Sequence, residues 1–207
     1  TASTLKGKSS LATIGRMRWS LGKDNMVGAV VSDRTVMDST LRHHLAGVDG
    51  RVSLTEAINL EGAVLGSSTS GDGQDGRLSP AAILRARANS RHVQSMLEAR
   101  YISPGFRTEN GFQPLADWVS VGNDTEVFIF PNIKAIPRIF MKPVKGDLVW
   151  TESGTLREYS YEPGIGLWTR GGGLMMLDAE VQGETFADQW FDTVSGSVMG
   201  GSAWTRW

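Results

Sequence analysis

The stretch from 147 to 164 reads Asp-Leu-Val-Trp-Thr-Glu-Ser-Gly-Thr-Leu-Arg-Glu-Tyr-Ser-Tyr-Glu-Pro-Gly, and it decides the fold class. Residues 147–151 and 155–161 are rich in the β-branched and aromatic types that favour strands. The segments that follow them, Glu152-Ser153-Gly154 and Glu162-Pro163-Gly164, contain the glycine and proline that tight turns require. We therefore expect consecutive antiparallel strands here.

The same pattern continues on both sides of this stretch. Further strands are predicted at 117–121, 125–130, 138–141, 166–170 and 174–177, with a turn at Gly122-Asn123-Asp124. A short helix is expected at 184–191. The carboxyl-terminal half, after residue 110, is thus predicted to be an antiparallel β meander or a small barrel.

The amino-terminal half is expected to combine strands with helix. Residues 11–21 and 26–31 predict a hairpin around Gly22-Lys23-Asp24-Asn25. The spacing in Ser53-Leu54-Thr55-Glu56 is that of a capping box, which predicts the start of a short helix. This half is therefore predicted to begin with strands and to continue with helix.

The clearest helix signal lies near 80–101. Ser79 can cap such a helix, Pro80 suits its first position, and helix-forming residues continue to about Tyr101. The segment before it, 66–76, is glycine-rich and polar and predicts a flexible loop. The expected fold class is mainly β with one substantial helix, an α+β fold.

Composition restricts the classes of function. The chain has 207 residues and no cysteine, which excludes disulfides, thiolate metal sites and cysteine nucleophiles. Its longest apolar runs, such as 127–131, are far shorter than the ~20 residues of a membrane-spanning helix, and its amino end lacks a signal-peptide pattern. We expect a soluble protein without membrane contact, built as a single assembly subunit over 1–207 that divides near residue 110.

The two halves differ in charge. Residues 1–110 hold fourteen Lys and Arg against ten Asp and Glu, and residues 111–207 hold seven against twelve. Opposite charges on two parts of one chain suit docking onto copies of itself. Arg85, Arg87 and Arg91 belong to an arginine-rich strip and are predicted to bind an acidic partner or, without sequence specificity, nucleic acid.

Motifs of catalysis and metal binding are weak. Gly66 and Gly71 have the spacing of a phosphate loop, but Asp72 stands where a lysine is needed. Asp72 and Asp75 are too few for a calcium loop. His43 and His44, adjacent on a strand, point to opposite faces and do not chelate together. We predict no catalytic, cofactor or metal site.

Six of the seven tryptophans lie after residue 110. They form either the core of the sheet or a surface that something else covers. The arm at 1–10 and the tail at 195–207 are expected to reach partners, with Trp204 and Trp207 as anchors. An alternative is a carbohydrate-binding or carbohydrate-active domain, in which exposed tryptophans stack on sugar rings beside paired carboxylates.

Residues Pro143-Val144-Lys145-Gly146-Asp147-Leu148-Val149-Trp150 resemble the Pro-x-x-Gly-Asp-x-Val-Trp start of small barrel domains in tailed-phage baseplate and tail proteins. The mobile arm, glycine-rich turns and aromatic tail are similar in style to virion structural proteins. This resemblance implies a non-enzymatic structural subunit, located in a virion, whose partners are copies of itself and other structural subunits of a particle, tail or neck.

Overall fold

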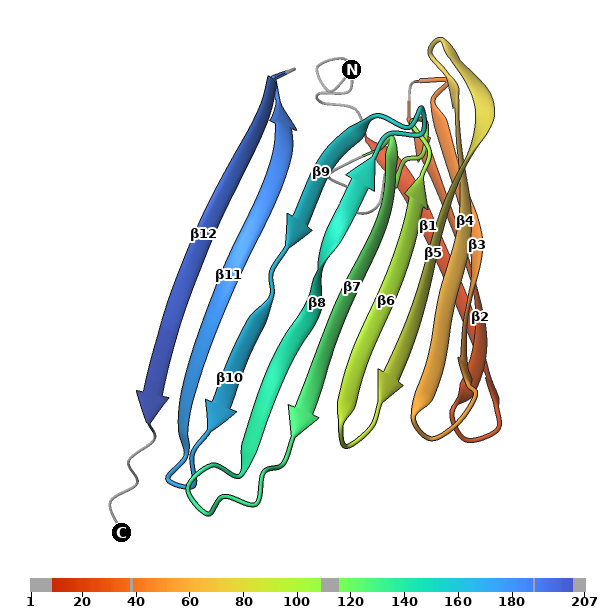
Figure 1. Ribbon diagram of the computed structural model, residues 1–207. Coiled ribbons are helices and arrows are strands. Elements are labelled where there is room, and N and C mark those ends of the chain that lie inside the picture. Colours follow the sequence, from red (N-terminus) through yellow and green to blue (C-terminus); the bar gives the residue numbers. More distant parts are fainter. Residues whose placement is uncertain (1–8, 38, 109–115, 188, 203–207) are drawn as a thin grey trace. The chain divides into compact units, whose positions relative to one another are not determined.

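The computed structural model describes residues 9–37, 39–108, 116–187 and 189–202. Every regular element among these residues is a β-strand (Figure 1). The strands are β1 (Ser10–Leu21), β2 (Asn25–Val36), β3 (Arg42–Ser53), β4 (Ile58–Gly71), β5 (Gln74–Asn89), β6 (Val93–Ile102), β7 (Trp118–Ile129), β8 (Arg138–Trp150), β9 (Leu156–Tyr161), β10 (Gly164–Trp168), β11 (Gly173–Phe186) and β12 (Gln189–Ser202). They pair in sequence order from β1 to β8 and on through β10, β11 and β12, while β9 pairs with β8 and β11. The predicted antiparallel meander is confirmed and extends over both halves of the chain.

The chain forms two compact units. Unit 1 consists of Thr1–Ser53, Leu60–Leu84 and Arg100–Val119, and unit 2 of Leu54–Asn59, Arg85–Ala99 and Ser120–Trp207. The division passes through β4, β5, β6 and β7. Each unit therefore has hydrogen-bonded strands and two sheet faces of its own.

The helix predicted near 80–101 is wrong. This segment forms β5 and β6, joined by a turn in which the backbone N–H of Ser90 donates to the carbonyl oxygen of Val93 at 2.8 Å. Alanine and arginine favour helices by only tenths of a kcal/mol per residue, about 0.7 kcal/mol at most. Residues 84–88 also alternate with period two, with Arg85 and Arg87 on one face of β5 and the apolar residues that flank them on the other. The hydrogen bonds to strands on both sides outweigh this small preference for helix.

The flexible loop predicted at 66–76 is also wrong. β4 continues to Gly71 and β5 starts at Gln74, so only Asp72 and Gly73 form the loop. Both have positive φ, 47° and 85°, as a two-residue hairpin turn requires. The Asp72 carboxylate accepts hydrogen bonds from the hydroxyls of Ser39 at 2.6 Å and Thr40 at 2.8 Å. The segment is a tight turn tied to a neighbouring connection.

The hairpin predicted for 11–21 and 26–31 is confirmed by β1 and β2, which turn at Gly22 with a φ of 83°. Two predicted breaks are continuous strand instead. Gly122-Asn123-Asp124 lies inside β7, and residues 142–146 lie inside β8. The strands are therefore longer than the short runs expected from the sequence. They include polar and glycine-containing stretches such as 122–126, whose backbone pairs with neighbouring strands.

The remaining expectations concern short helices and chain ends. The helix expected from Ser53 to just before Gly66 is the turn between β3 and β4 followed by the first part of β4. The helix expected at 184–191 is the hairpin of β11 and β12. Residues 195–202 of the expected tail belong to β12. The rest of that tail and all of the arm before Ser9 lie outside the described residues.

An irregularity in β8 sets the faces of unit 2. Lys142 pairs with Gly164 and Gly146 pairs with Tyr161, so β8 advances four residues while its partner advances three. The extra residue is a β-bulge, opposite the break between β9 and β10. It reverses the alternation along β8, and Lys142 and Lys145 therefore lie on the same face although they are three residues apart.

Candidate functional site

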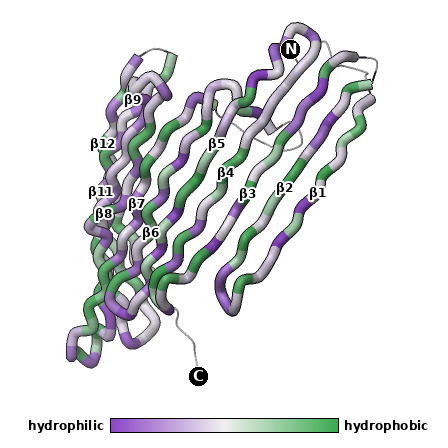
Figure 2. The backbone as a smooth tube through the Cα atoms, turned by 90° about the vertical axis from the view of Figure 1, so that its right-hand side faces the viewer, coloured by the Kyte–Doolittle hydropathy of each residue, from purple (hydrophilic) through white to green (hydrophobic). Residues whose placement is uncertain are grey.

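Large apolar side chains of unit 1 lie on an exposed face of its sheet. The register places Met17 beside Ala29 and Ala29 beside Val48, so these residues of β1, β2 and β3 share one face. Met17 is 59% exposed and Val48 56%. Figure 2 shows hydrophobic and hydrophilic residues interspersed along β2 and β3. Other exposed apolar residues on this apolar face of unit 1 are Leu11, Trp19, Leu21, Val27, Val31 and Val52, whereas Ile14 lies on the opposite face.

The opposite, polar face of unit 1 carries paired charges. Arg16 contacts Asp49 at 3.1 Å, and Arg51 contacts Glu61 at 3.2 Å. His43 is buried on this face, and its Nδ1 lies 2.9 Å from the hydroxyl of Thr69. These contacts therefore lie on the side away from the large apolar residues, whereas Asp33 and His44 pair on the apolar face.

Unit 2 repeats the arrangement. Leu177 of β11 lies between Ile165 of β10 and Val198 of β12, and the three are 54%, 48% and 81% exposed. Other members of this apolar face of unit 2 are Val144, Leu148, Met175, Trp190 and Val194. Among the described residues only six apolar side chains are buried, namely Val36, Ala81, Phe106, Phe128, Phe140 and Val149. The apolar residues of the strands are mostly outside, not in a core.

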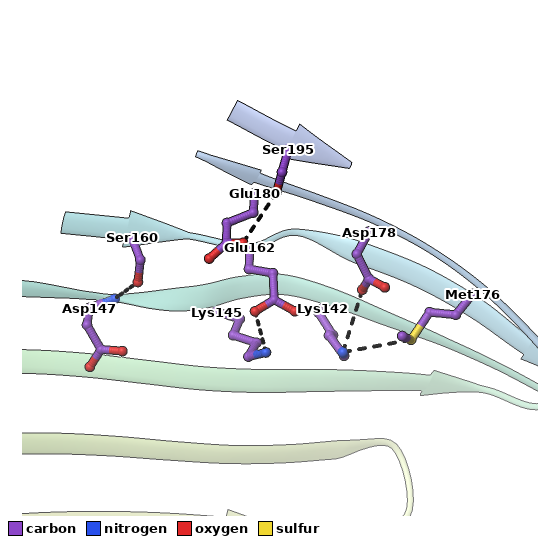
Figure 3. A network of polar contacts seen from close by, with 9 residues as sticks. All are labelled: Lys142, Lys145, Asp147, Ser160, Glu162, Met176, Asp178, Glu180 and Ser195. Atoms are coloured by element: carbon purple, nitrogen blue, oxygen red, sulfur yellow. Dashed lines mark hydrogen bonds and ion pairs between the residues drawn. The ribbon is translucent and has the colours of Figure 1, made fainter. Parts of the chain in front are cut away.

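The polar face of unit 2 holds a network of charged side chains. In Figure 3 the side chains of Lys142 and Asp178 point towards each other, and their Nζ and Oδ1 atoms lie 3.6 Å apart. Lys145 donates a hydrogen bond to Glu162 at 2.5 Å, and this contact raises the pKa of Lys145 against the opposing effect of burial. The bulge in β8 brings the two lysines to this face.

Glu158 lies on the same polar face, in β9. It is paired with Glu184 of β11 in the strand register. Burial raises the pKa of Glu158, and the charges of Glu184 and Asp147 raise it further. The carboxylates here are only partly offset by the two lysines, and the face is locally electronegative.

An aromatic pair stands where β11 turns into β12. Tyr159 and Trp190 stack with ring centroids 5.8 Å apart. The Tyr159 hydroxyl and the Trp190 indole N–H both donate to Asp192, at 3.0 and 2.8 Å, and the first of these bonds raises the pKa of Tyr159. Each ring thus has an apolar body and a hydrogen-bonded polar tip, close to the turn between β11 and β12.

The predicted partner-binding arginines do not form one strip on a helix. Arg85 and Arg87 share a face of β5, where Arg85 makes an ion pair with Glu98 of β6. Arg91 lies in the turn after β5, with its guanidinium 4.8 Å from the ring centroid of Phe130. Trp204 and Trp207 lie outside the described residues, and their role as anchors stays a prediction.

The histidines are dispersed, as the alternation of strand side chains requires. His43 faces Thr69, while His44 faces Asp33 on the other side of β3, at 2.5 Å. His92 packs edge-on against Phe130. Within the described ranges, no group of three or more histidine, aspartate and glutamate side chains has the arrangement of a metal site.

The two-faced organisation was missed by sequence reasoning, although a signal for it exists. In β1 the odd positions from Leu11 to Leu21 carry most of the large apolar residues, and the even positions Arg16 and Arg18 carry charge. Glycine and threonine at Thr13 and Gly15 interrupt the alternation. A search for continuous apolar runs therefore passes over it.

Comparison of the chain with models of protein families, with curated proteins and with solved structures found no significant match. The part of the chain that the structure describes contains no helix with the length and apolar character needed to cross a membrane. The function must therefore be inferred from the two faces of the sheet.

Proposed function

We propose that this protein is a non-enzymatic structural component of a membrane, in which the apolar face of each unit lies against lipid hydrocarbon. The polar faces then meet water or other polypeptides. The observation that carries the proposal is that most of the exposed large apolar side chains of neighbouring strands share one face, while most of the ion pairs lie on the other. Membrane-embedded sheets alternate apolar and polar residues in this way.

The apolar faces are more stable when they are buried away from water. Burying one valine or leucine side chain contributes about 1.5–3 kcal/mol, and contiguous apolar patches beyond a few hundred Å² are rare on monomers in water. Leu177, Ile165 and Val198 adjoin in three successive strands and are all about half exposed or more. Exposure of such a face to water would be costly.

The lengths of the strands and the positions of the aromatic residues favour lipid over protein as the partner of the apolar faces. Apart from β9 and β10, the strands have 10 to 16 residues. A strand crosses the ~30 Å hydrocarbon layer with about 9–11 residues. Trp19, Tyr159 and Trp190 stand near strand ends, where tyrosine and tryptophan meet the interface between hydrocarbon and water.

The sheet edges add a requirement. Among the described residues β1 pairs only with β2, and β12 only with β11. Backbone groups on an open edge find no hydrogen-bond partner in lipid. Each outer edge must then pair with a further strand, from another copy or another polypeptide segment, so the proposal keeps the self-association expected from the sequence. It replaces the expectation of a protein without membrane contact.

The test uses the absence of cysteine. We would prepare single-cysteine variants at adjacent positions, V198C with S197C in unit 2 and V31C with S32C in unit 1. Labelling with a membrane-impermeant maleimide is measured in phospholipid vesicles, with the urea-unfolded protein as the reference for full reaction. Val198 and Val31 positions should be protected, and the neighbouring serine positions should react.

Two results would contradict the proposal. Equal labelling of both members of each pair in vesicles would show that the faces do not differ. Protection of the valine positions in a lipid-free aqueous oligomer would show that other subunits cover the apolar face, which is the assembly role expected from the sequence.

A further inference from the structure

A hollow of about 380 Å³ interrupts the apolar face of unit 1. It spans β1 to β5, and its lining includes Thr13, Asp33, His44, Ala46, Ser68 and Leu78. The hollow exists because two of its lining residues, Ala46 and Gly66, are small. Ala46 lies beside Val31. The Leu78 side chain lies over Gly66, where an added Cβ would be 2.9 Å from the Cδ1 atom of Leu78.

One end of the hollow is polar. Thr13 lies opposite Asp33 in the strand register, and Asp33 lies opposite His44. The Asp33 carboxylate and the Nδ1 atom of His44 are 2.5 Å apart, and both side chains are about half exposed, at 48% and 56%. A carboxylate on an apolar sheet face is costly unless it is paired, and His44 pairs with its Oδ2 atom. The half-exposed carboxylate can still accept further hydrogen bonds from a ligand.

The other end is apolar. Val31 and Ala46 lie two residues further from the strand ends than Asp33 and His44, and Leu78 closes that side. The hollow therefore has a polar row near the end of β2 and an apolar row towards the middle of the strands. An amphiphile has the same order of groups, with a head at the membrane interface and a chain in the hydrocarbon.

The polar row presents mainly hydrogen-bond acceptors. The Ser68 hydroxyl already donates to the carbonyl oxygen of Gly76 at 2.7 Å, so its oxygen is left to accept. Asp33 accepts through its carboxylate, and Thr13 contributes a hydroxyl oxygen. Thr13 and Asp33 lie in paired positions on adjacent strands, so a primary ammonium group, with three N–H donors and a positive charge, can donate to both. Ser68 lies further along the row, beyond His44.

We propose that this hollow binds a lipid with a primary ammonium headgroup. The ammonium lies at Asp33 and Thr13, and the start of an acyl chain lies along Val31, Ala46 and Leu78. This inference rests on the proposed function, because it takes the apolar face of unit 1 to meet lipid. It adds a chemical preference among lipids that the separation of faces does not require.

The test compares two lipids with the same acyl chains and the same phosphate. Phosphatidylethanolamine carries N–H donors, and phosphatidylcholine has a trimethylammonium group without them. We would release the full-length protein from vesicles containing both and measure the lipids retained by native mass spectrometry. Retention of phosphatidylethanolamine should exceed that of phosphatidylcholine about tenfold, the effect of one charge-assisted hydrogen bond. Free ethanolamine should not compete, since it lacks the chain.

Two variants should remove the preference. D33N deletes the charge that faces the ammonium, and A46L fills the exposed hollow without entering a core. Matched controls are D49N, on the polar face beside Arg16, and V48L, on the same apolar face outside the hollow. Equal retention of the two lipids by the native protein, or an unchanged preference in both D33N and A46L, would overturn the inference.

The two proposals fail in different ways. If cysteine labelling shows lipid contact but retention is equal, the aminolipid site is wrong and the proposed function stands. If V31C reacts freely in vesicles, the membrane role itself is wrong.

Discussion

Glu158 of β9 lies directly opposite Glu184 of β11, so two carboxylates share one position on the polar face of unit 2. Like charges in this position destabilise a strand pair. Burial and the neighbouring carboxylates raise the pKa of Glu158 above its ordinary 4.5, which means that the folded protein holds this proton more tightly than the unfolded chain. Stability is therefore lost as pH rises through the raised pKa.

The variant E158Q should accordingly be more stable than the native protein at pH 7, by up to about 1 kcal/mol. The gain should shrink on acidification and vanish below the ordinary glutamate pKa, where Glu158 is protonated in both states. Urea unfolding at several pH values measures it. E126Q, in β7, is the control of equal charge change; a gain for E158Q that does not depend on pH would contradict the assignment.

The contact between Lys142 and Asp178 should matter more than surface ion pairs. Their side chains are only 13% and 9% exposed, and Asp178 Oδ1 has no hydrogen-bond partner. K142M leaves a buried carboxylate uncompensated and should lower the free energy of unfolding by about 3 kcal/mol. Adding D178N should restore much of the loss, because the unpaired charge is gone.

The matched comparison is the pair formed by Arg16 and Asp49, whose side chains are 53% and 22% exposed. R16M should cost less than about 1 kcal/mol. Equal losses for K142M and R16M would show that burial on the polar face of unit 2 does not strengthen its ion pair.

An arginine on the apolar face should show whether this face contacts water or lipid. V198R places an arginine at a site that is 81% exposed, which in water would change stability little. Against lipid the same change should cost about 2–4 kcal/mol and reduce insertion into vesicles. S197R, one residue away on the polar face beside Asp178, should insert normally. Equal insertion of the two variants would argue against lipid contact.

The absence of a side chain at Gly183 leaves the space in which Tyr159 and Trp190 stack. A Cβ at this position would lie 2.5 Å from ring atoms of both Tyr159 and Trp190, so neither ring could keep its position. G183A should destabilise the protein by about 1–3 kcal/mol and change the near-ultraviolet circular dichroism of the stacked rings. The control is G196A on β12, where the nearest atom is 3.6 Å away. Similar spectra for G183A and the native protein would show that the stack adapts.

The sequence predicted strands where apolar and aromatic residues lie close together and turns contain glycine or proline, as in β1, β2 and β9. It misplaced 80–101 because alanine and arginine favour helix locally, while the alternation in β5 is visible only when every second residue is compared. Neither the ion pair of Lys142 with Asp178 nor the hollow beside Asp33 could be predicted, since each joins residues from strands that are distant in the chain.

By itself the sequence determined that the chain lacks thiol chemistry and that its carboxyl-terminal half is an antiparallel sheet, because composition and turn residues act locally. Tertiary structure alone decided which residues share a face. Side chains alternate along a strand with period two, so a shift of one residue in register, or one extra residue as in β8, moves every later side chain to the other side. Whether Lys142 meets Asp178, and which face carries Val198, follows from that pairing.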